Sequence, residues 1–345
     1  MLSLIFTIIL VPFVPVFMYG NLADTADIIS GRDKVLGESK NKDETAQDCD
    51  VPEFESKASY SLFPLNYSGG QGFTPIRKPD FYEIRVWAGS SVAIDVDSGT
   101  ILEYFDGRKR TQIASLTKLM TAVLAVEKIE NLNEGVTITR EALNVPGTVV
   151  GCPTSVLCTS NRMYAGEKIT AGDLLKAMLL DSANDAAHAL AIHISGSPEK
   201  FTAEMNEKAK SLGLKDTNFC TPSGLEIDGQ ESECYSSAYD IARIAAYSLK
   251  HELIWNTMRI EEAQIFSTDQ KYMHQLKNTD LLLSEMPDCI GGKTGFTPMA
   301  GKSLLLAVSD PTKRHRVIAV ILNDEDRWND MKKLISWVFE NYEWR

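Results

Sequence analysis

The sequence predicts an α/β fold built on an antiparallel sheet that is flanked by helices, with a helical subdomain between its strands. Three observations favour it: two β-rich runs near residue 90, a long series of helical runs from about 115 to 253, and two further β-rich runs followed by an amphipathic helix. Strands on both sides of a helical stretch can join in one sheet, so we expect a layered domain of sheet and helices.

The individual elements follow from apolar periodicity and turn residues. SSVAIDV and ILEYF are expected strands, joined by a tight turn at Asp97 and Gly99. The expected helices, in chain order, cover about 115–130, 171–181, 184–194, 199–212 and 235–253. SLLLAVSD and HRVIAVILND are expected strands, and DMKKLISWVFENY is the expected closing helix.

Composition is that of an ordinary globular protein. Of the 345 residues, 44% are hydrophobic and 24% are charged, which excludes a disordered or collagen-like chain. The 35 Lys and Arg residues against 47 Asp and Glu residues give a formal net charge of −12. This balance argues against general nucleic-acid binding, which needs a basic face to neutralise phosphates.

Residues 1–20 form an apolar run without a charged side chain, and they predict an export signal or an uncleaved N-terminal membrane anchor. Pro12 and Pro15 disfavour the alternative, a buried helix of the fold. Either of the first two interpretations places the rest of the chain outside the cytoplasm. The polar, Pro- and Gly-punctuated stretch 21–75 is an expected linker or disordered N-terminus, and 76–345 is the expected catalytic domain.

The first chemical motif is Ser115-Leu-Thr-Lys118. On a helix, residues three apart share a face, so Lys118 can lie beside the Ser115 hydroxyl and remove its proton if burial lowers the lysine pKa. The spacing alone is weak, because Ser39–Lys42 and Ser197–Lys200 also match it. Ser115 differs in being surrounded by apolar residues, as expected of a half-buried site at the start of a helix.

The second motif is Ser182-Ala-Asn184, between two expected helices. A turn there can direct the Ser182 hydroxyl and the Asn184 amide into one cleft, where the hydroxyl relays a proton and the amide positions substrate or lysine. Taken alone, the pattern is more typical of a helix cap.

The third motif is Lys293-Thr294-Gly295, preceded by two glycines. Lys293 offers a positive charge and Thr294 a hydroxyl to a substrate carboxylate, while Gly295 allows a close backbone approach. We expect this segment at a sheet edge beside the cleft.

Together and in this order, the three motifs form the set shared by penicillin-binding proteins and class A β-lactamases. The chain resembles the serine-type D-alanyl-D-alanine carboxypeptidases, the low-molecular-weight penicillin-binding proteins of peptidase family S11. The blocks that carry the resemblance are IASLTKLMTAVLAVE, LLDSANDAAHALA, AKSLGLKDTNFCTPSGL, SSAYDIARIA, IGGKTGFTPMAG and RWND, and they span roughly residue 80 to the C-terminus.

The resemblance implies a penicillin-binding-protein/β-lactamase-like fold and a two-step acyl transfer on peptidoglycan stem peptides. Ser115 would attack the bond between two terminal D-alanines with Lys118 as general base. Ser182 would pass a proton to the departing D-alanine. β-Lactams would be covalent inhibitors, and no cofactor is implied.

The same resemblance implies the substrate-binding residues. Lys293 and Thr294 would hold the terminal carboxylate, with Asn184 and Gly295 in supporting positions. Backbone N–H groups of Ser115 and Phe296 would form the oxyanion hole. Many family members carry a second, β-rich domain and an amphipathic tail, whereas this chain ends three residues after its expected last helix. We therefore expect any membrane attachment to involve the N-terminus.

Three other functions are compatible with the motifs. A DD-endopeptidase acting on peptidoglycan cross-links could use the same residues. A class A-like β-lactamase would add a Glu-x-x-x-Asn element after Asn184, but the sequence has only Glu127 to Asn131, on another element. An inactive peptidoglycan-binding module would be free to lose its nucleophile, which this chain retains.

The six cysteines suit an exported protein. The local pairs Cys152–Cys158 and Cys220–Cys234 are the disulfides we expect, and free thiols in small pockets are the alternative. Cys289 lies four residues before Lys293 and suggests a structural role near the site. The five histidines show no metal-binding spacing, so we expect no metal, and His188 and His193 are expected packing residues.

Overall fold

The computed structural model describes residues 73–152 and 162–345. The expected export signal or anchor (1–20) and all but the last three residues of the expected linker (21–75) lie outside the described residues. Among the helices that the structure describes, none is both long enough and apolar enough to cross a membrane.

The elements of the described chain are, in order, β1 (Pro75–Arg77), β2 (Ser90–Asp95), β3 (Ile101–Phe105), η1 (Ala114–Thr117), α1 (Lys118–Lys128), β4 (Gly135–Thr137), α2 (Arg140–Leu143), β5 (Lys168–Thr170), α3 (Ala171–Leu180), α4 (Asn184–Ser195), α5 (Pro198–Ser211), η2 (Glu231–Glu233), α6 (Ala238–Ser248), α7 (Glu252–Met258), β6 (Glu262–Phe266), β7 (Met273–Lys277), β8 (Cys289–Thr297), β9 (Gly301–Ser309), β10 (Arg316–Asp324), α8 (Arg327–Asn341) and β11 (Tyr342–Trp344).

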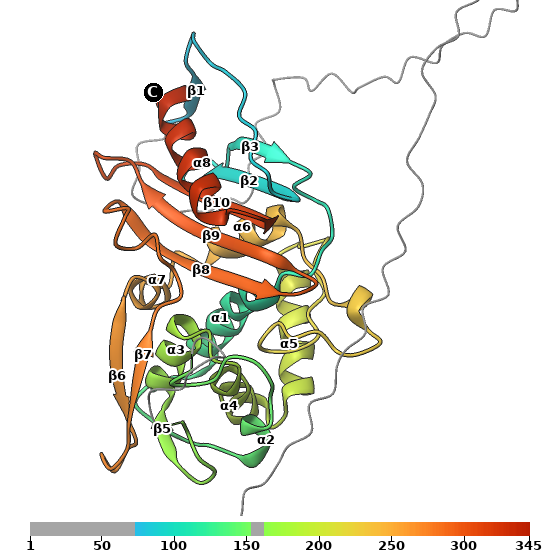
Figure 1. Ribbon diagram of the computed structural model, residues 1–345, viewed down its shortest axis with the longest axis vertical. Coiled ribbons are helices and arrows are strands. Elements are labelled where there is room, and N and C mark those ends of the chain that lie inside the picture. Colours follow the sequence, from blue (N-terminus) through green and yellow to red (C-terminus); the bar gives the residue numbers. More distant parts are fainter. Residues whose placement is uncertain (1–72, 153–161) are drawn as a thin grey trace, which may run out of the picture. The chain divides into compact units, whose positions relative to one another are not determined.

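The centre of the fold is a five-stranded antiparallel sheet in the order β3-β2-β10-β9-β8. As the sequence predicts, it takes β2 and β3 from the N-terminal side and β8 to β10 from the C-terminal side of the helical stretch. Helix α8 covers one face and α6 the other, while α1, α3, α4 and α5 gather into a helical subdomain beyond α6 (Figure 1). Strand β8 forms one edge of the sheet, so its outer side is available to a site.

Side chains on the central strands alternate between two apolar clusters, because successive residues of a strand point to opposite faces. In β10, Ile318 and Val320 join the cluster shared with α1, α3, α4 and α6, whereas Ala319 and Ile321 join the cluster under α8. Both faces of the central strands are therefore buried. This explains why their sequences are continuous apolar runs with no polar alternation.

Side-chain caps and a buried tryptophan set the limits of several helices. The Thr170, Ser197 and Ser237 hydroxyls each accept a backbone N–H at the start of α3, α5 and α6. The single helix expected over 235–253 is in fact two, α6 and α7. The chain leaves the helical conformation at His251, and Trp255 Nε1 packs back to donate to Ser248 Oγ at 3.0 Å.

Several short strand pairs were not predicted. The antiparallel pairs β4–β5, β6–β7 and β1–β11 use strands of three to five residues. Such strands are too short for apolar alternation to distinguish them from loops. They form separate two-stranded sheets and do not extend the main sheet.

Candidate active site

The structure brings the three sequence motifs to one place. Lys118 Nζ lies 2.8 Å from Ser115 Oγ and 2.7 Å from Asn184 Oδ1. Two residues before Asn184, the Ser182 hydroxyl accepts a hydrogen bond from Lys293 Nζ at 3.0 Å. Helix α1, the turn between α3 and α4, and the edge strand β8 thus each contribute to one polar cluster.

Ser115 sits in the short helix η1, directly before α1, and is half-buried. The preceding Ala114 has a positive φ of 47°, a backbone conformation that non-glycine residues rarely adopt. Two glycines permit this arrangement: a Cβ on Gly295 would lie 2.9 Å from Ile113 O, and one on Gly224 would lie 1.9 Å from Ala114 O. The turn that carries the nucleophile is therefore held between β8 and the loop at Gly224.

Lys118 is completely buried, and its amine has three polar neighbours. It contacts Ser115 Oγ, Asn184 Oδ1 and, at 2.8 Å, the backbone carbonyl oxygen of Ser223. Burial, and then the positive charge of Lys293, holds the pKa of Lys118 well below its usual range. The amine is consequently neutral at a pH where an exposed lysine is charged, which is the state a general base requires.

The Ser182–Asn184 turn is held by the segment 146–151. Ser182 has a positive φ of 59°, and its carbonyl accepts from Thr148 Oγ1 at 2.6 Å. Asn184 N donates to Thr148 O, and Asn184 Nδ2 donates to Pro146 O, both at 2.8 Å. Because Pro146 O can only accept, it fixes the amide orientation that turns Oδ1 toward Lys118. Left-handed backbone on non-glycine residues costs about 1–3 kcal/mol each and is concentrated at functional sites.

Two buried aspartates hold the other end of the same segment. Asp181 accepts from Gly151 N at 2.9 Å and from Lys277 N at 2.6 Å, and Asp185 accepts from Val150 N at 3.0 Å. Burial raises the pKa of each carboxyl to about 6. These carboxylates therefore fix the backbone on both sides of Ser182.

Lys293 is also buried, and burial lowers its pKa to about 7. Its ammonium group donates to Ser182 Oγ and to Thr294 O at 3.1 Å. The Asp280 carboxylate acts in the opposite direction to burial and favours the charged form of Lys293. The Thr294 hydroxyl exchanges a hydrogen bond of 2.6 Å with Thr279 Oγ1.

Gly295 and Phe296 follow in β8. Arg327, at the start of α8, donates from Nη1 to Gly295 O at 2.9 Å, which fixes this part of the edge strand. The Phe296 ring is 60% exposed, so this residue presents an aromatic surface to solvent. All eight site residues expected from the sequence thus lie on the three converging segments.

Several residues that build the site have no signal in the sequence. Ser223 acts through its backbone carbonyl, for which no side-chain pattern exists, although it lies in the block CTPSGL. Thr148 and Arg327 donate hydrogen bonds to the motifs from other segments of the chain, and Asp280 acts on Lys293 through its charge. Of these last three residues, only Arg327 lies in one of the blocks that carry the resemblance, RWND.

The expected disulfide Cys220–Cys234 is present. Cys158, the expected partner of Cys152, lies outside the described residues. Cys289 is a buried free cysteine, and burial raises the pKa of its thiol to about 12, so it is protonated. His188 is partly buried and lies 3.3 Å from Ser223 Oγ, whereas His193 pairs with Glu134 at 2.6 Å near the surface.

Known proteins resemble this chain in sequence. The family model of D-alanyl-D-alanine carboxypeptidase matches residues 77–326. The D-alanyl-D-alanine carboxypeptidase DacF of Bacillus subtilis is 34% identical over 76% of this chain and 64% of its own length. DacD of Escherichia coli is 31% identical over 82% of this chain and 70% of its own length. The chain thus spans about two thirds of the length of these relatives.

Solved structures agree in fold. A penicillin-binding protein homolog from Mycobacterium tuberculosis superposes with a TM-score of 0.67 at 26% identity, covering 77% of this chain and 96% of that one. The Streptomyces K15 DD-transpeptidase gives a TM-score of 0.66 at 25% identity, covering 75% and 99%. These likenesses confirm the predicted penicillin-binding-protein fold. The chain belongs to the D-alanyl-D-alanine carboxypeptidase family, peptidase family S11.

Proposed function

We propose that this protein is a serine-type D-alanyl-D-alanine carboxypeptidase, which removes the terminal D-alanine from peptidoglycan stem peptides through an acyl-enzyme on Ser115. One observation carries the proposal. A buried lysine amine whose pKa lies well below its usual range is 2.8 Å from a half-buried serine hydroxyl. This is the arrangement that makes a serine nucleophilic at neutral pH.

The partners of Lys118 explain how the proton leaves Ser115. A neutral amine has two N–H donors and one lone pair. Asn184 Oδ1 and Ser223 O can only accept, so they take the two N–H groups and leave the lone pair directed at Ser115. The Ser115 hydroxyl then donates to Lys118, and the proton moves to the amine as Ser115 Oγ attacks the carbonyl carbon.

Lys293, Thr294 and Ser182 act on the other end of the scissile bond. The terminal carboxylate of the substrate binds to the charged Lys293 ammonium and the Thr294 hydroxyl. The Ser182 hydroxyl donates its proton to the nitrogen of the departing D-alanine and takes a replacement proton from the Lys293 ammonium, which donates to Ser182 Oγ at 3.0 Å. Protonation converts that nitrogen into an amine that can leave, and Ser115 stays acylated until water hydrolyses the ester.

Backbone N–H groups of Ser115 and Phe296 stabilise the oxyanion of the tetrahedral intermediate. The close packing of Gly295 on Ile113 and Ala114 supports this, because it brings the backbone of β8 against the turn that carries Ser115. A side chain at position 295 would push the two segments apart.

The substrate implies where the protein works and what inhibits it. Peptidoglycan lies outside the cytoplasm, in agreement with the apolar run at residues 1–20 and with a tether at the N-terminus. β-Lactams mimic the D-alanyl-D-alanine terminus and acylate the same serine. The name of one structural relative, a penicillin-binding protein homolog, supports this expectation.

Endopeptidase action on cross-links is a second candidate. A D-alanyl-D-alanine endopeptidase of Haemophilus influenzae is 33% identical over 69% of this chain and 76% of its own length. The chemistry at Ser115 is the same, and only the amine that departs as the acyl-enzyme forms differs: a free D-alanine for a carboxypeptidase, the cross-linked peptide for an endopeptidase.

The test is release of D-alanine from a pentapeptide that ends in D-Ala-D-Ala by the full-length chain. We expect release by the parent and none by Ser115→Ala. A cross-linked muropeptide dimer, assayed in parallel, distinguishes the two activities, since an endopeptidase cleaves the dimer faster than the pentapeptide. Release by Ser115→Ala at the parent's rate would contradict the proposed nucleophile.

A further inference from the structure

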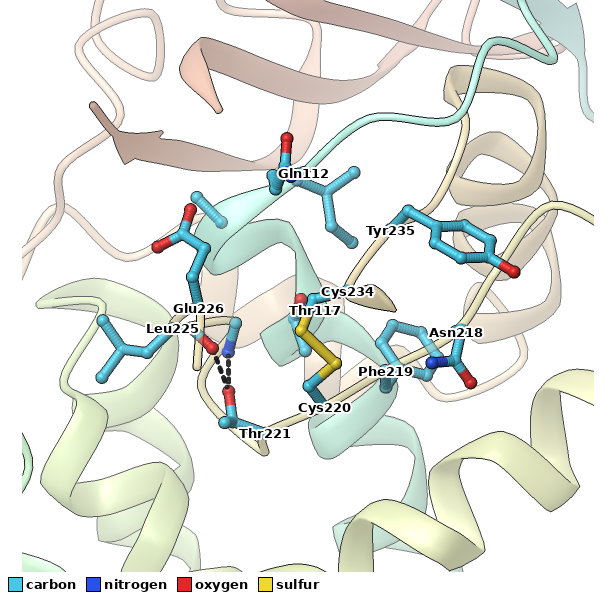
Figure 2. Close-up of a pocket in the computed structure, with 13 residues that line it drawn as sticks. Gln112, Thr117, Asn218, Phe219, Cys220, Thr221, Leu225, Glu226, Cys234 and Tyr235 are labelled. Carbon is cyan, nitrogen blue, oxygen red and sulfur yellow. Dashed lines mark hydrogen bonds between the residues drawn. A yellow bond between two sulfur atoms is a disulfide. The ribbon is translucent and has the colours of Figure 1, made fainter. Parts of the chain in front are cut away.

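The loop between Cys220 and Cys234 reaches the general base directly, and a disulfide closes it. The two cysteines are 14 positions apart, and their Cα atoms lie 5.4 Å apart. Both are half-buried and line a pocket between this loop and the start of α1, together with Gln112, Thr117 and Tyr235 (Figure 2). The disulfide therefore lies next to the first turn of the helix that carries Lys118.

Three consecutive residues of the loop hold that turn. Pro222 O accepts from Thr121 Oγ1 at 2.6 Å, and Ser223 O accepts from Lys118 Nζ at 2.8 Å. Gly224 packs so closely on Ala114 O that no Cβ would fit. The position of the loop thus determines where one of the two acceptors of the Lys118 amine lies.

Other contacts also hold the loop: Gln112 Nε2 donates to Glu231 O at 2.8 Å, and His188 Nε2 lies 3.3 Å from Ser223 Oγ. At its base, Asn218 and Tyr235 exchange backbone hydrogen bonds of 2.8 and 3.0 Å, and Phe219 is bound at both its N–H and its carbonyl by Asn206. Beyond Glu226, which accepts from Thr297, residues 227–230 are exposed. The disulfide ties the two ends of this loop together covalently, and its Cys220 lies only two positions before Pro222, where the contacts with the first turn of α1 begin.

We propose that the Cys220–Cys234 disulfide positions the general base: it fixes the Ser223 carbonyl against Lys118, so its reduction slows acylation of Ser115. A dithiol reductant supplies the two electrons. The S–S bond breaks, Cys220 and Cys234 become thiols, and the reductant becomes a disulfide. This inference rests on the proposed function, because it assumes that Lys118 activates Ser115.

Loosening the loop has two consequences for Lys118. One N–H group loses its fixed acceptor, so the lone pair is no longer held toward Ser115. Water also reaches the amine, which weakens the effect of burial and raises the pKa of Lys118 toward its ordinary value. The charged and titratable groups that face this amine are Lys293 from β8 and Asp185 and His188 from α4, and none of them belongs to the loop.

The test uses the full-length chain and a fluorescent penicillin. The Cys220→Ala/Cys234→Ala double variant is compared with the parent, before and after treatment with dithiothreitol. Ile335→Ala, which shortens a buried side chain of α8, controls for a general loss of stability. The readouts are the second-order acylation rate constant from pH 5 to 9 and the circular dichroism spectrum, which reports whether each protein is folded.

We expect the double variant and the dithiothreitol-treated parent to acylate about tenfold more slowly at pH 7 while folded. The acidic limb of their pH profile moves to higher pH, which a loss of stability alone would not produce. Cys152 is also disulfide-bonded, so any effect of dithiothreitol on the double variant comes from that other disulfide and is smaller than its effect on the parent; Ile335→Ala keeps the parent's profile. If the double variant does not fold, the reduced parent supplies the same comparison.

Two results would overturn the inference: a double variant with the parent's rate constant and pH profile, or an equal effect of dithiothreitol on parent and double variant. An oxidised parent that forms no penicillin adduct would instead overturn the proposed function, and the inference with it.

Discussion

A single methyl group at Gly224 tests the contact between the disulfide-closed loop and the nucleophile turn. Gly224 has a φ of +82°, and a Cβ there would lie 1.9 Å from Ala114 O. The same loop offers a matched control, Gly229, with a φ of +79° and no atom within 4 Å of a Cβ. Alanine at either position meets the same backbone strain, and only Gly224→Ala adds the steric conflict.

The two contributions can be estimated separately. A left-handed backbone costs an alanine about 1–2 kcal/mol, and overpacking a close contact costs about 1–3 kcal/mol more. We therefore expect Gly229→Ala to lower the free energy of unfolding by about 1–2 kcal/mol and Gly224→Ala by about 2–5 kcal/mol, measured by urea denaturation. Because Ala114 directly precedes Ser115, the clash also displaces the nucleophile.

Acylation by a fluorescent penicillin, measured at a temperature where both variants are folded, is the second assay. We expect Gly229→Ala to react at the parent's rate and Gly224→Ala to react at least about tenfold more slowly. Equal losses of stability in the two variants, or a Gly224→Ala protein with the parent's acylation rate, would refute the packing argument.

Two further predictions concern charge. Asp280→Asn removes a buried carboxylate that favours the charged form of Lys293, so the pKa of Lys293 falls below about 7. We therefore expect the basic limb of the pH profile of acylation to move to lower pH. A basic limb at the parent's pH would contradict this. Burial acts to raise the pKa of the Glu127 carboxyl, but hydrogen bonds donated by Lys208, Tyr247 and His251 lower it from its ordinary value of 4.5 to about 2. The stability this carboxylate contributes is present above about pH 4.5 and is lost as the pH falls through 2. Solvent screens the ion pair of Glu127 with Lys208, so we expect Glu127→Gln to lower the free energy of unfolding by only about 1 kcal/mol at pH 7 and by almost nothing at pH 2. Urea denaturation at both pH values measures this difference. An equal loss at both pH values would exclude an electrostatic origin.

The sequence predicts the main sheet and the site segments because their signals are local. Apolar runs such as SLLLAVSD and HRVIAVILND are long enough to identify β9 and β10. The spacing in Ser-x-x-Lys places Lys118 beside Ser115 through helical geometry alone. The pairing of Cys220 with Cys234 also follows from proximity in the chain, and the structure confirms it.

What the sequence cannot predict depends on contacts between distant segments. The Ser223 carbonyl and the Asp280 carboxylate reach the site from elsewhere in the chain, and a backbone carbonyl has no residue signature. The break between α6 and α7 is similar, because both segments are helical by periodicity and the chain separates them at His251. Ala114 and Ser182 adopt left-handed backbone conformations, which the local sequence does not favour for either residue. Such conformations are common where tertiary contacts hold a functional turn.

The central claim is that Ser115 is the acylated nucleophile. The most direct measurement is the intact mass of the full-length chain and of its Ser115→Ala variant after brief exposure to penicillin, with peptide mapping of any adduct. We predict one penicilloyl adduct on the parent, located on the peptide that contains Ser115, and none on the variant. An adduct on both proteins, or a parent that leaves both its own mass and the drug unchanged, would contradict the account.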